Sequence, residues 1–416
     1  MNTNNLLSSM KVLLPPVLLA FLWGGCSAQE ALSPKTIQTG AEVLVEEHLA
    51  ELDGQRVGLL MNPTSRVDGV HMVDTLLNLG VNVTALYAAE HGFRGEAGAG
   101  EVIEDGVDQE TGLPVHSLYG KTKKPTSEML EDIDILLFDL PDMGVRFYTY
   151  NVTLGLALEA IAENGKELWV LDRPNPLGGE SVAGWILQDQ YKSFVGAYPI
   201  PIVYGLTMGE IAHMAVGEGW LSLPTEPDFK VIKAKGWKRD MRWPDTGLEW
   251  VAPSPNLPSF EHVFAYVGTV IFEGTNISEG RGTSDPFLQI GAPGMNFQAD
   301  ELEILEQRHN VQLDSITFTP KSIPGKAISP KFEGEICQGI RISFDGNYQQ
   351  TDPLMLGLDL LLFAQDHTKD FAIKPFASNL FGIDLKSIIE KKESIPSWEN
   401  DVQTFRHQRE AYLLYK

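Results

Sequence analysis

Short apolar runs alternate with stretches of helical apolar spacing through the first half of the chain. The runs lie at residues 57–61, 83–88, 133–140 and 168–171, with 201–204 as a candidate fifth. Between them, apolar residues recur every three or four positions, as in Val73, Leu76 and Leu77. Strands that alternate with helices predict βαβ units and a parallel sheet covered on both faces. We therefore predict one α/β domain over residues 36–225.

The second half has a different pattern. Residues 221–260 are rich in Pro and Trp and include the constrained stretch 253–258. Strand-like runs then occur at 267–272, 316–318 and 339–344, and helical patterns at 353–366, 379–392 and 397–415. This order predicts a smaller α+β domain over residues 226–416.

The N-terminal segment has the features of an export signal. Lys11 precedes an apolar run at 12–23, which is too short to span a bilayer and is followed by Gly24-Gly25-Cys26. We expect a signal peptide over residues 1–25 with lipidation of Cys26; plain secretion and a retained anchor are the alternatives. The mature protein would then be periplasmic or attached to the outer membrane. Cys337 would remain as a lone cysteine, which we expect to be buried.

The charge balance restricts the partners. With 32 Lys+Arg against 56 Asp+Glu, the formal net charge is −24. This surplus excludes a broad nucleic-acid footprint and adhesion to anionic lipid by charge alone. Membrane contact is therefore expected only through a lipid anchor at Cys26, and the sequence leaves the oligomeric state open.

Polar residues follow four successive predicted strands. They are Asn62-Pro63-Thr64, then Glu90-His91-Gly92-Phe93-Arg94, then Asp139 and Asp142 with Arg146-Phe147-Tyr148, and finally Asp172-Arg173-Pro174-Asn175. Because ligands bind at the carboxyl ends of parallel strands, we expect a shared site there. Helix capping alone would explain one such end, but not four.

Several classes of site lack their signatures. Gly98-x-Gly100 has Ile103 where a dinucleotide-binding loop needs its third glycine, and no Gly-x-Ser-x-Gly elbow occurs. The histidines match no standard metal-ligand spacing. We therefore expect no cofactor and no metal.

One dense segment of the second half, residues 272–283, contains Glu273, Asn276, Glu279 and Arg281 among three glycines. It is either a solvated turn with a surface ion pair or part of a site, and the glycines favour a site. Carboxylates on two segments are the equipment of glycoside hydrolysis, and arginines suit a substrate that carries its own carboxylate. The residues alone thus predict an extracytoplasmic hydrolase of an acidic sugar.

Seven ordered motifs make the sequence resemble a known family, the NamZ/YbbC-like exo-β-N-acetylmuramidases of bacteria. They are Asn62–Thr64, Glu90–Gly95, 111–115, 144–150, 171–176, 253–256 and 272–283. The resemblance implies a Rossmann-like domain, a smaller α/β domain and an active site in the cleft between them. It also implies release of N-acetylmuramic acid from the non-reducing end of peptidoglycan fragments, with disaccharides and muropeptides as the molecules bound.

The resemblance also implies roles for particular residues. The catalytic candidates are Glu90, His91, and Glu273 or Glu279 as the second carboxylate. The candidates for substrate binding are Asn62, Arg94, Asp139, Arg146, Tyr148, Asp172, Arg173, Asn256, Asn276 and Arg281, with Arg281 and Arg173 placed on the lactyl group. The sequence leaves open a retaining, an inverting or a substrate-assisted mechanism. A non-catalytic muropeptide-binding lipoprotein and a glycosidase for another acidic or acetylated sugar are the alternative functions.

Overall fold

The computed structural model describes residues 37–95, 104–346 and 348–416. The expected signal at 1–25 and the lipidation site at Cys26 lie outside the described residues. Contacts group residues 36–416 into one compact unit, and the expected division between 225 and 226 stays a prediction.

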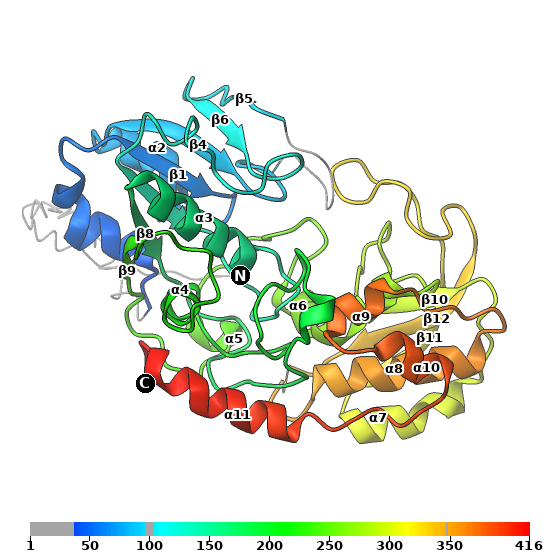
Figure 1. Ribbon diagram of the computed structural model, residues 1–416. Helices are drawn as coiled ribbons and strands as arrows, with labels where there is room; N and C mark the ends of the chain where they lie inside the picture. The colour runs from blue at the N-terminus through cyan, green and yellow to red at the C-terminus, as the bar shows by residue number, and fades with distance from the viewer. Residues whose placement is uncertain (1–36, 96–103, 347) are drawn as a thin grey trace, which may run out of the picture. The chain divides into compact units, whose positions relative to one another are not determined.

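Seven strands of the first half form one sheet (Figure 1). They are β1 (Val57–Met61), β4 (Val83–Ala88), β5 (Gly106–Val107), β6 (Pro114–Ser117), β7 (Ile135–Asp139), β8 (Glu167–Leu171) and β9 (Asp228–Ile232). The order is β5-β6-β4-β1-β7-β8-β9, and every neighbouring pair is parallel except β5 with β6. Without the edge strand β5, this is the Rossmann order, in which the chain leaves β1 first to one side and then to the other. The expected fold class is confirmed.

Helices cover both faces of this sheet. They are α1 (Gly40–Val43), α2 (Met72–Asn78), α3 (Tyr150–Asn164) and α4 (Met208–Gly217). On β7, Ile135 and Leu137 join a core that contains residues of α1 and α2, whereas Leu136 and Phe138 join the core that contains residues of α3 and α4. This alternation follows from the two-residue period of a strand and explains why the strands were recognisable as continuous apolar runs.

Helix α4 begins with a capping box at Thr207. The Thr207 hydroxyl accepts from the Glu210 backbone N–H, and the Glu210 carboxylate accepts from the Thr207 N–H, which completes a capping box on α4. The chain reaches β1 through a short succession of helical turns: after α1 come a π-helix, η1 (Leu44–His48), and a 3₁₀-helix, η2 (Leu49–Leu52).

Two expected strands are wrong. Residues 201–204 make only isolated bridges, from Val203 to Val145 and Ala183, and the outer strand of the sheet is β9. Strand β9 contains the charged residues Asp228 and Lys230, and only Ile232 of its five residues is buried, so it has no apolar run like those of the central strands. Residues 267–272 lie in helix α6 (Phe260–Thr269) and the 3₁₀-helix η4 (Val270–Gly274). A short apolar run buried on all sides fits a helix as well as a strand.

The second half adds a small antiparallel sheet and further helices. The sheet has the order β10-β12-β11, with β10 (Gln289–Ala292), β11 (Gln312–Phe318) and β12 (Cys337–Ser343). Its main helices are α7 (Glu303–His309), α8 (Pro353–His367), α9 (Phe376–Phe381), α10 (Leu385–Glu390) and α11 (Glu399–Arg409). Helices α6 and α8 cross at Gly268 and Gly357, where a Cβ on Gly268 would meet the Pro353 carbonyl oxygen at 2.1 Å. Cys337 is buried as expected, and burial raises the pKa of its thiol to about 11.

The remaining short elements are the hairpin strands β2 (Arg66–Val67) and β3 (Val70–His71), helix α5 (Trp243–Thr246), and the 3₁₀-helices η3 (Asp189–Tyr191), η5 (Ala299–Leu302) and η6 (Glu410–Tyr412). Helix α11 runs back from the second half toward α4 (Figure 1). Its buried Arg409 donates to the backbone carbonyls of Gly179, Tyr204 and Gly205. Beyond it, the Tyr415 hydroxyl donates to Oδ2 of Asp172 at 2.6 Å, so the C-terminal residues are tied to the end of β8.

Candidate active site

A cavity of about 450 Å³ opens where the residues after β4 meet segments of the second half. Six of the candidate residues line it: Glu90, His91, Tyr148, Glu273, Glu279 and Arg281. All four catalytic candidates are thus brought to one cavity from segments that are far apart in the sequence.

Glu90 follows β4 and lies among hydroxyl groups. The Thr149 hydroxyl donates to its Oε2 at 2.9 Å, and the Tyr150 hydroxyl donates to its backbone carbonyl at 2.9 Å. Tyr119 lines the same cavity, and burial together with the Glu90 charge raises the pKa of its hydroxyl. At His91 the backbone adopts a positive φ of 75°, which is uncommon for a non-glycine residue and turns the chain sharply after Glu90.

The second-half carboxylates share one arginine. Arg281 donates from Nη2 to Oε1 of Glu273 at 2.6 Å, and its Nε lies 3.6 Å from Oε1 of Glu279. Burial lowers the pKa of Arg281, but Glu273 and Glu279 more than offset this and raise it. Arg281 therefore stays charged and screens the two carboxylates from each other.

Glu279 has a second cationic partner in Lys331. The Lys331 Nζ donates to Oε2 of Glu279 at 2.7 Å and to the backbone carbonyls of Phe272 and Ile277. The Glu279 side chain is only 6 % exposed, against 22 % for Glu273. Oε2 of Glu273 accepts no hydrogen bond from any described residue. Of the two, Glu273 therefore has the carboxylate oxygen that is available to a ligand.

Aromatic side chains form the walls between these groups. The Phe147 and Tyr266 rings meet edge to face, as do those of Tyr266 and Phe287, with centroids 5.2 and 4.7 Å apart. The Arg281 guanidinium lies 5.0 Å from the Phe287 ring centroid. Burial raises the pKa of Tyr148 well above its ordinary value, so its phenol stays protonated. Such walls suit the apolar face of a sugar ring.

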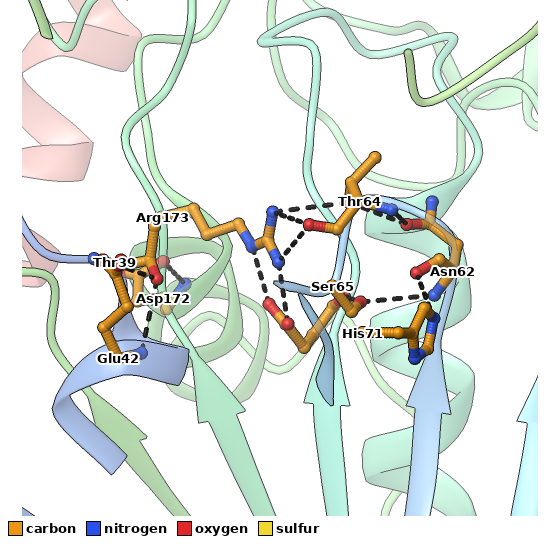
Figure 2. Close-up of polar contacts among 10 residues, drawn as sticks. Thr39, Glu42, Asn62, Thr64, Ser65, His71, Asp172 and Arg173 are labelled. Carbon is orange, nitrogen blue, oxygen red and sulfur yellow. Dashed lines mark hydrogen bonds and ion pairs between the residues drawn. The ribbon is translucent and has the colours of Figure 1, made fainter. Parts of the chain in front are cut away.

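At the switch point of the sheet, where a Rossmann fold ordinarily binds its ligand, an internal ion pair fills the strand ends. Arg173 donates to both oxygens of Asp139, at 2.6 and 2.7 Å, and to the Thr64 carbonyl at 3.0 Å. Figure 2 shows the Arg173 guanidinium pointing toward Thr64. Asp139 is fully buried, so this bidentate pair holds the loops after β1, β7 and β8 together.

Asn62 extends this network toward the cavity. Its Oδ1 accepts from the Thr64 hydroxyl at 2.7 Å, and its Nδ2 donates to the Tyr150 hydroxyl at 3.1 Å. The Tyr150 hydroxyl in turn donates to the backbone carbonyl of Glu90. His71 packs beneath it (Figure 2). Burial lowers the pKa of His71, so this ring is neutral and its Nε2 lies 3.1 Å from the Asn62 carbonyl oxygen. Asn62 thus acts on Glu90 through Tyr150.

The other candidates do not line the cavity. Arg94 is held by Asp74, Asp108 and Glu110. Arg146 is fully buried and donates to the carbonyls of Trp185, Ile200 and Leu380; burial lowers its pKa to about 9.

Asp172 also lies away from the cavity. It accepts from Thr207, Gly209 and Tyr415, and burial raises its pKa to about 6. Asn276 binds the backbone of Asp370 and Ala372, and Asn256 that of Lys326.

Sequence reasoning missed several residues that line the cavity: Tyr119, Thr149, Lys326 and Lys331. Thr149 lies inside the motif at 144–150 and could have been found there. The two lysines lie in the irregular stretch after β11, where no pattern in the sequence distinguishes them from solvated surface residues.

Two further findings apply to residues 37–95, 104–346 and 348–416. No helix there is long and apolar enough to cross a membrane. The same part of the chain contains no cluster of His, Cys, Asp and Glu side chains that could hold a metal ion.

Carboxylates, hydroxyl groups and aromatic walls in one cavity are the groups that a glycoside hydrolase uses, and the comparisons with known proteins place the chain in that class. The family models for the N-terminal and C-terminal parts of the exo-β-N-acetylmuramidase NamZ match residues 57–261 and 264–415. The chain belongs to the NamZ exo-β-N-acetylmuramidase family, as the resemblance in its motifs predicted.

Known relatives match along nearly the whole chain. The peptidoglycan β-N-acetylmuramidase NamZ of Bacillus subtilis is 41 % identical over 397 residues, which is 93 % of each chain. Crystal structures of two DUF1343 family proteins from Bacteroides fragilis have TM-scores of 0.78 and 0.76 at 36 % and 34 % identity. They cover 92 % and 91 % of this chain, and 100 % and 99 % of their own. The matches thus include both halves that build the cavity.

Proposed function

We propose that the protein hydrolyses the β-glycosidic bond of a terminal N-acetylmuramic acid at the non-reducing end of peptidoglycan fragments. The observation that carries the proposal is the convergence of Glu90 with Glu273 and Arg281 on one cavity. Membership of the NamZ family and the named activity of the Bacillus subtilis relative support the same reaction.

Glu90 is the proton donor in this proposal. Glu90 lines the cavity, where the Thr149 hydroxyl donates to its Oε2 at 2.9 Å and Tyr119 lies on the same wall. Glu90 donates its proton to the glycosidic oxygen as the bond from that oxygen to the anomeric carbon breaks. Water supplies the hydroxyl group of the released sugar, and its second proton restores the acid.

Glu273 is the carboxylate that faces the developing positive charge at the anomeric carbon. Its Oε1 is fixed by Arg281, its Oε2 makes no hydrogen bond with any described residue, and Glu273 lines the cavity. Glu279 has a positioning role, because its two oxygens lie against Arg281 and Lys331 and it orients the arginine that orients Glu273.

The test is incubation of the purified protein with a disaccharide that ends in N-acetylmuramic acid, followed by detection of the free sugar by mass spectrometry. A parallel panel of chromogenic β-N-acetylmuramide, β-N-acetylglucosaminide and β-glucuronide tests the sugar class. Release of N-acetylmuramic acid is expected. Binding without release would instead indicate a muropeptide-binding protein, and preferential release of another sugar would overturn the substrate assignment.

The site of action is part of the proposal. Lys11, the apolar run at 12–23 and Cys26 support export and lipidation, and the proposed place of action is therefore the periplasm or the outer membrane. Mass spectrometry of the protein purified from the membrane fraction should find a lipid-modified Cys26 as its first residue, and Cys26→Ala should abolish that modification. An unmodified Cys26, or a different first residue, would overturn the assignment of Cys26.

A further inference from the structure

We propose that Lys326 binds the lactyl carboxylate of the terminal N-acetylmuramic acid and thereby selects this sugar over sugars without a lactyl group. The proposal rests on the proposed function and assigns a specificity residue within the same cavity. The resemblance in sequence placed this role on Arg281 and Arg173, whereas the geometry points to Lys326.

The argument begins with the charges that line the cavity. Three residues with long cationic side chains line it: Arg281, Lys331 and Lys326. Arg281 is committed to Glu273 and Glu279, and Lys331 to Glu279 and two backbone carbonyls. Arg173 does not line the cavity and donates to Asp139 from both Nε and Nη2.

Lys326 is different because its ammonium group makes no ion pair with any described residue. It lies at an exposed position beside the cavity, where an anion can approach without displacing an existing partner. A carboxylate placed elsewhere in the cavity would lie near Glu90, Glu273 or Glu279 and be repelled by their charges. A negatively charged substituent of the substrate therefore meets the least electrostatic repulsion on the side of the cavity where Lys326 lies.

The backbone that carries Lys326 is fixed. Residues 323–327 form a tight turn in which the Ile323 N–H donates to the Ala327 carbonyl at 2.8 Å and Gly325 has a φ of +70°. Asn256, which is 3 % exposed, donates from Nδ2 to the Lys326 carbonyl oxygen at 2.8 Å. Asn256 comes from the proline-rich stretch at 253–258, and in this proposal it is a positioning residue for Lys326.

The experiment compares two chromogenic substrates: the β-N-acetylmuramide, and the same compound with its lactyl carboxylate converted to a neutral amide. Lys326→Ala should raise KM for the acid about tenfold, because the substrate loses one charge-assisted hydrogen bond at an exposed position. The value of kcat should change little. It should leave KM for the amide unchanged. Lys326→Arg should restore most of the affinity, because it keeps the charge.

Two controls make the outcome specific. Lys321→Ala removes a neighbouring exposed lysine that does not line the cavity, and it should leave both substrates unaffected. Asn256→Ala should raise KM for the acid more than for the amide, which a general loss of fold would not do.

If the wild-type protein hydrolyses the acid and Lys326→Ala has an unchanged KM, this inference is wrong while the proposed function stands. If the wild-type protein hydrolyses neither compound, the proposed function itself fails.

Discussion

The Nζ atom of Lys331 lies 2.7 Å from Oε2 of Glu279, and the same ammonium group donates to the carbonyls of Phe272 and Ile277. One side chain from the irregular stretch after β11 therefore holds both ends of the segment that carries Glu273. The wall of the cavity depends on this contact, although Lys331 has no part in the proposed chemistry.

Replacing Lys331 by Met should lower the free energy of unfolding by about 1–3 kcal/mol, because a buried carboxylate and two carbonyls lose their donor. Thermal denaturation followed by circular dichroism measures the change. Lys321→Met, at an exposed position, is the matched control and should have no effect. Equal melting temperatures for the two variants would contradict the structural role of Lys331.

Replacing Glu90 by Gln should lower kcat on the chromogenic muramide by about 10²- to 10⁴-fold, because the amide cannot donate a proton to the leaving oxygen. Glutamine keeps the size of the side chain and can still accept the Thr149 hydrogen bond, so the melting temperature should stay near that of the wild type. Glu128→Gln, at an exposed position outside the cavity, serves as the control. A Glu90→Gln enzyme with normal kcat would refute the assignment.

Glu273→Gln and Glu279→Gln should separate the two carboxylates of the second half. The first should lower kcat by at least about 10²-fold with little change in stability, since the available carboxylate charge is lost. The second should mainly lower the melting temperature, because Lys331 and Arg281 then lose a buried counter-charge. Steady-state kinetics and thermal denaturation of both variants decide this, and the reverse pattern would exchange their roles.

Asp142 should make stability depend on pH. Burial raises the pKa of its carboxyl from 3.8 to about 8 in the folded protein. Between these values the unfolded chain binds fewer protons than the folded protein, so the free energy of unfolding falls as the pH rises. Asp142→Asn removes this titration. The free energy of unfolding of the variant should therefore increase relative to that of the wild type between pH 5 and pH 8. Denaturant unfolding curves at these two pH values measure it, and a constant difference between the proteins would show that Asp142 does not titrate in this range.

Tyr415→Phe should lower the free energy of unfolding by about 1–3 kcal/mol. The Tyr415 hydroxyl donates to Asp172 and accepts from the Ala234 N–H at 3.0 Å, and both buried partners would lose it. Tyr412→Phe removes a hydroxyl that binds the exposed Glu218, and it should lower the free energy of unfolding by less than Tyr415→Phe does. Melting temperatures of the two variants test the difference, and an equal loss would contradict it.

The central part of the fold was predictable because its signal is local. Strands β1 and β4 have the bounds expected from their apolar runs, since buried parallel strands are apolar on both faces. Strand β9 was missed because it lies at the accessible edge of the sheet and carries charges. The run at 267–272 was misassigned because an apolar stretch of that length carries no periodicity that separates a helix from a strand.

The residues of the candidate site also include some that the sequence could reveal and others that only the tertiary structure reveals. Glu90, Glu273 and Glu279 were found because carboxylates beside glycines in loops are conspicuous in a sequence. Arg173 and Arg146 are equally conspicuous, yet the structure shows them bound to Asp139 and to backbone carbonyls. Whether an arginine has a partner depends on residues far away in the sequence, such as Leu380 for Arg146. Lys326 and Lys331 reach the cavity only through tertiary structure.

The hydrogen bond between Tyr415 and Asp172 also has a consequence for biosynthesis. The two residues are 243 positions apart, so β8 is made long before its C-terminal partner. At ribosomal speeds of about 5–20 residues per second, the interval is roughly 10–50 s. During that time the Asp172 carboxyl lacks the donor that the finished protein supplies. A chain that stopped short of residue 415 would keep this defect permanently, so proteases that act on incompletely folded chains could distinguish it from the full-length product.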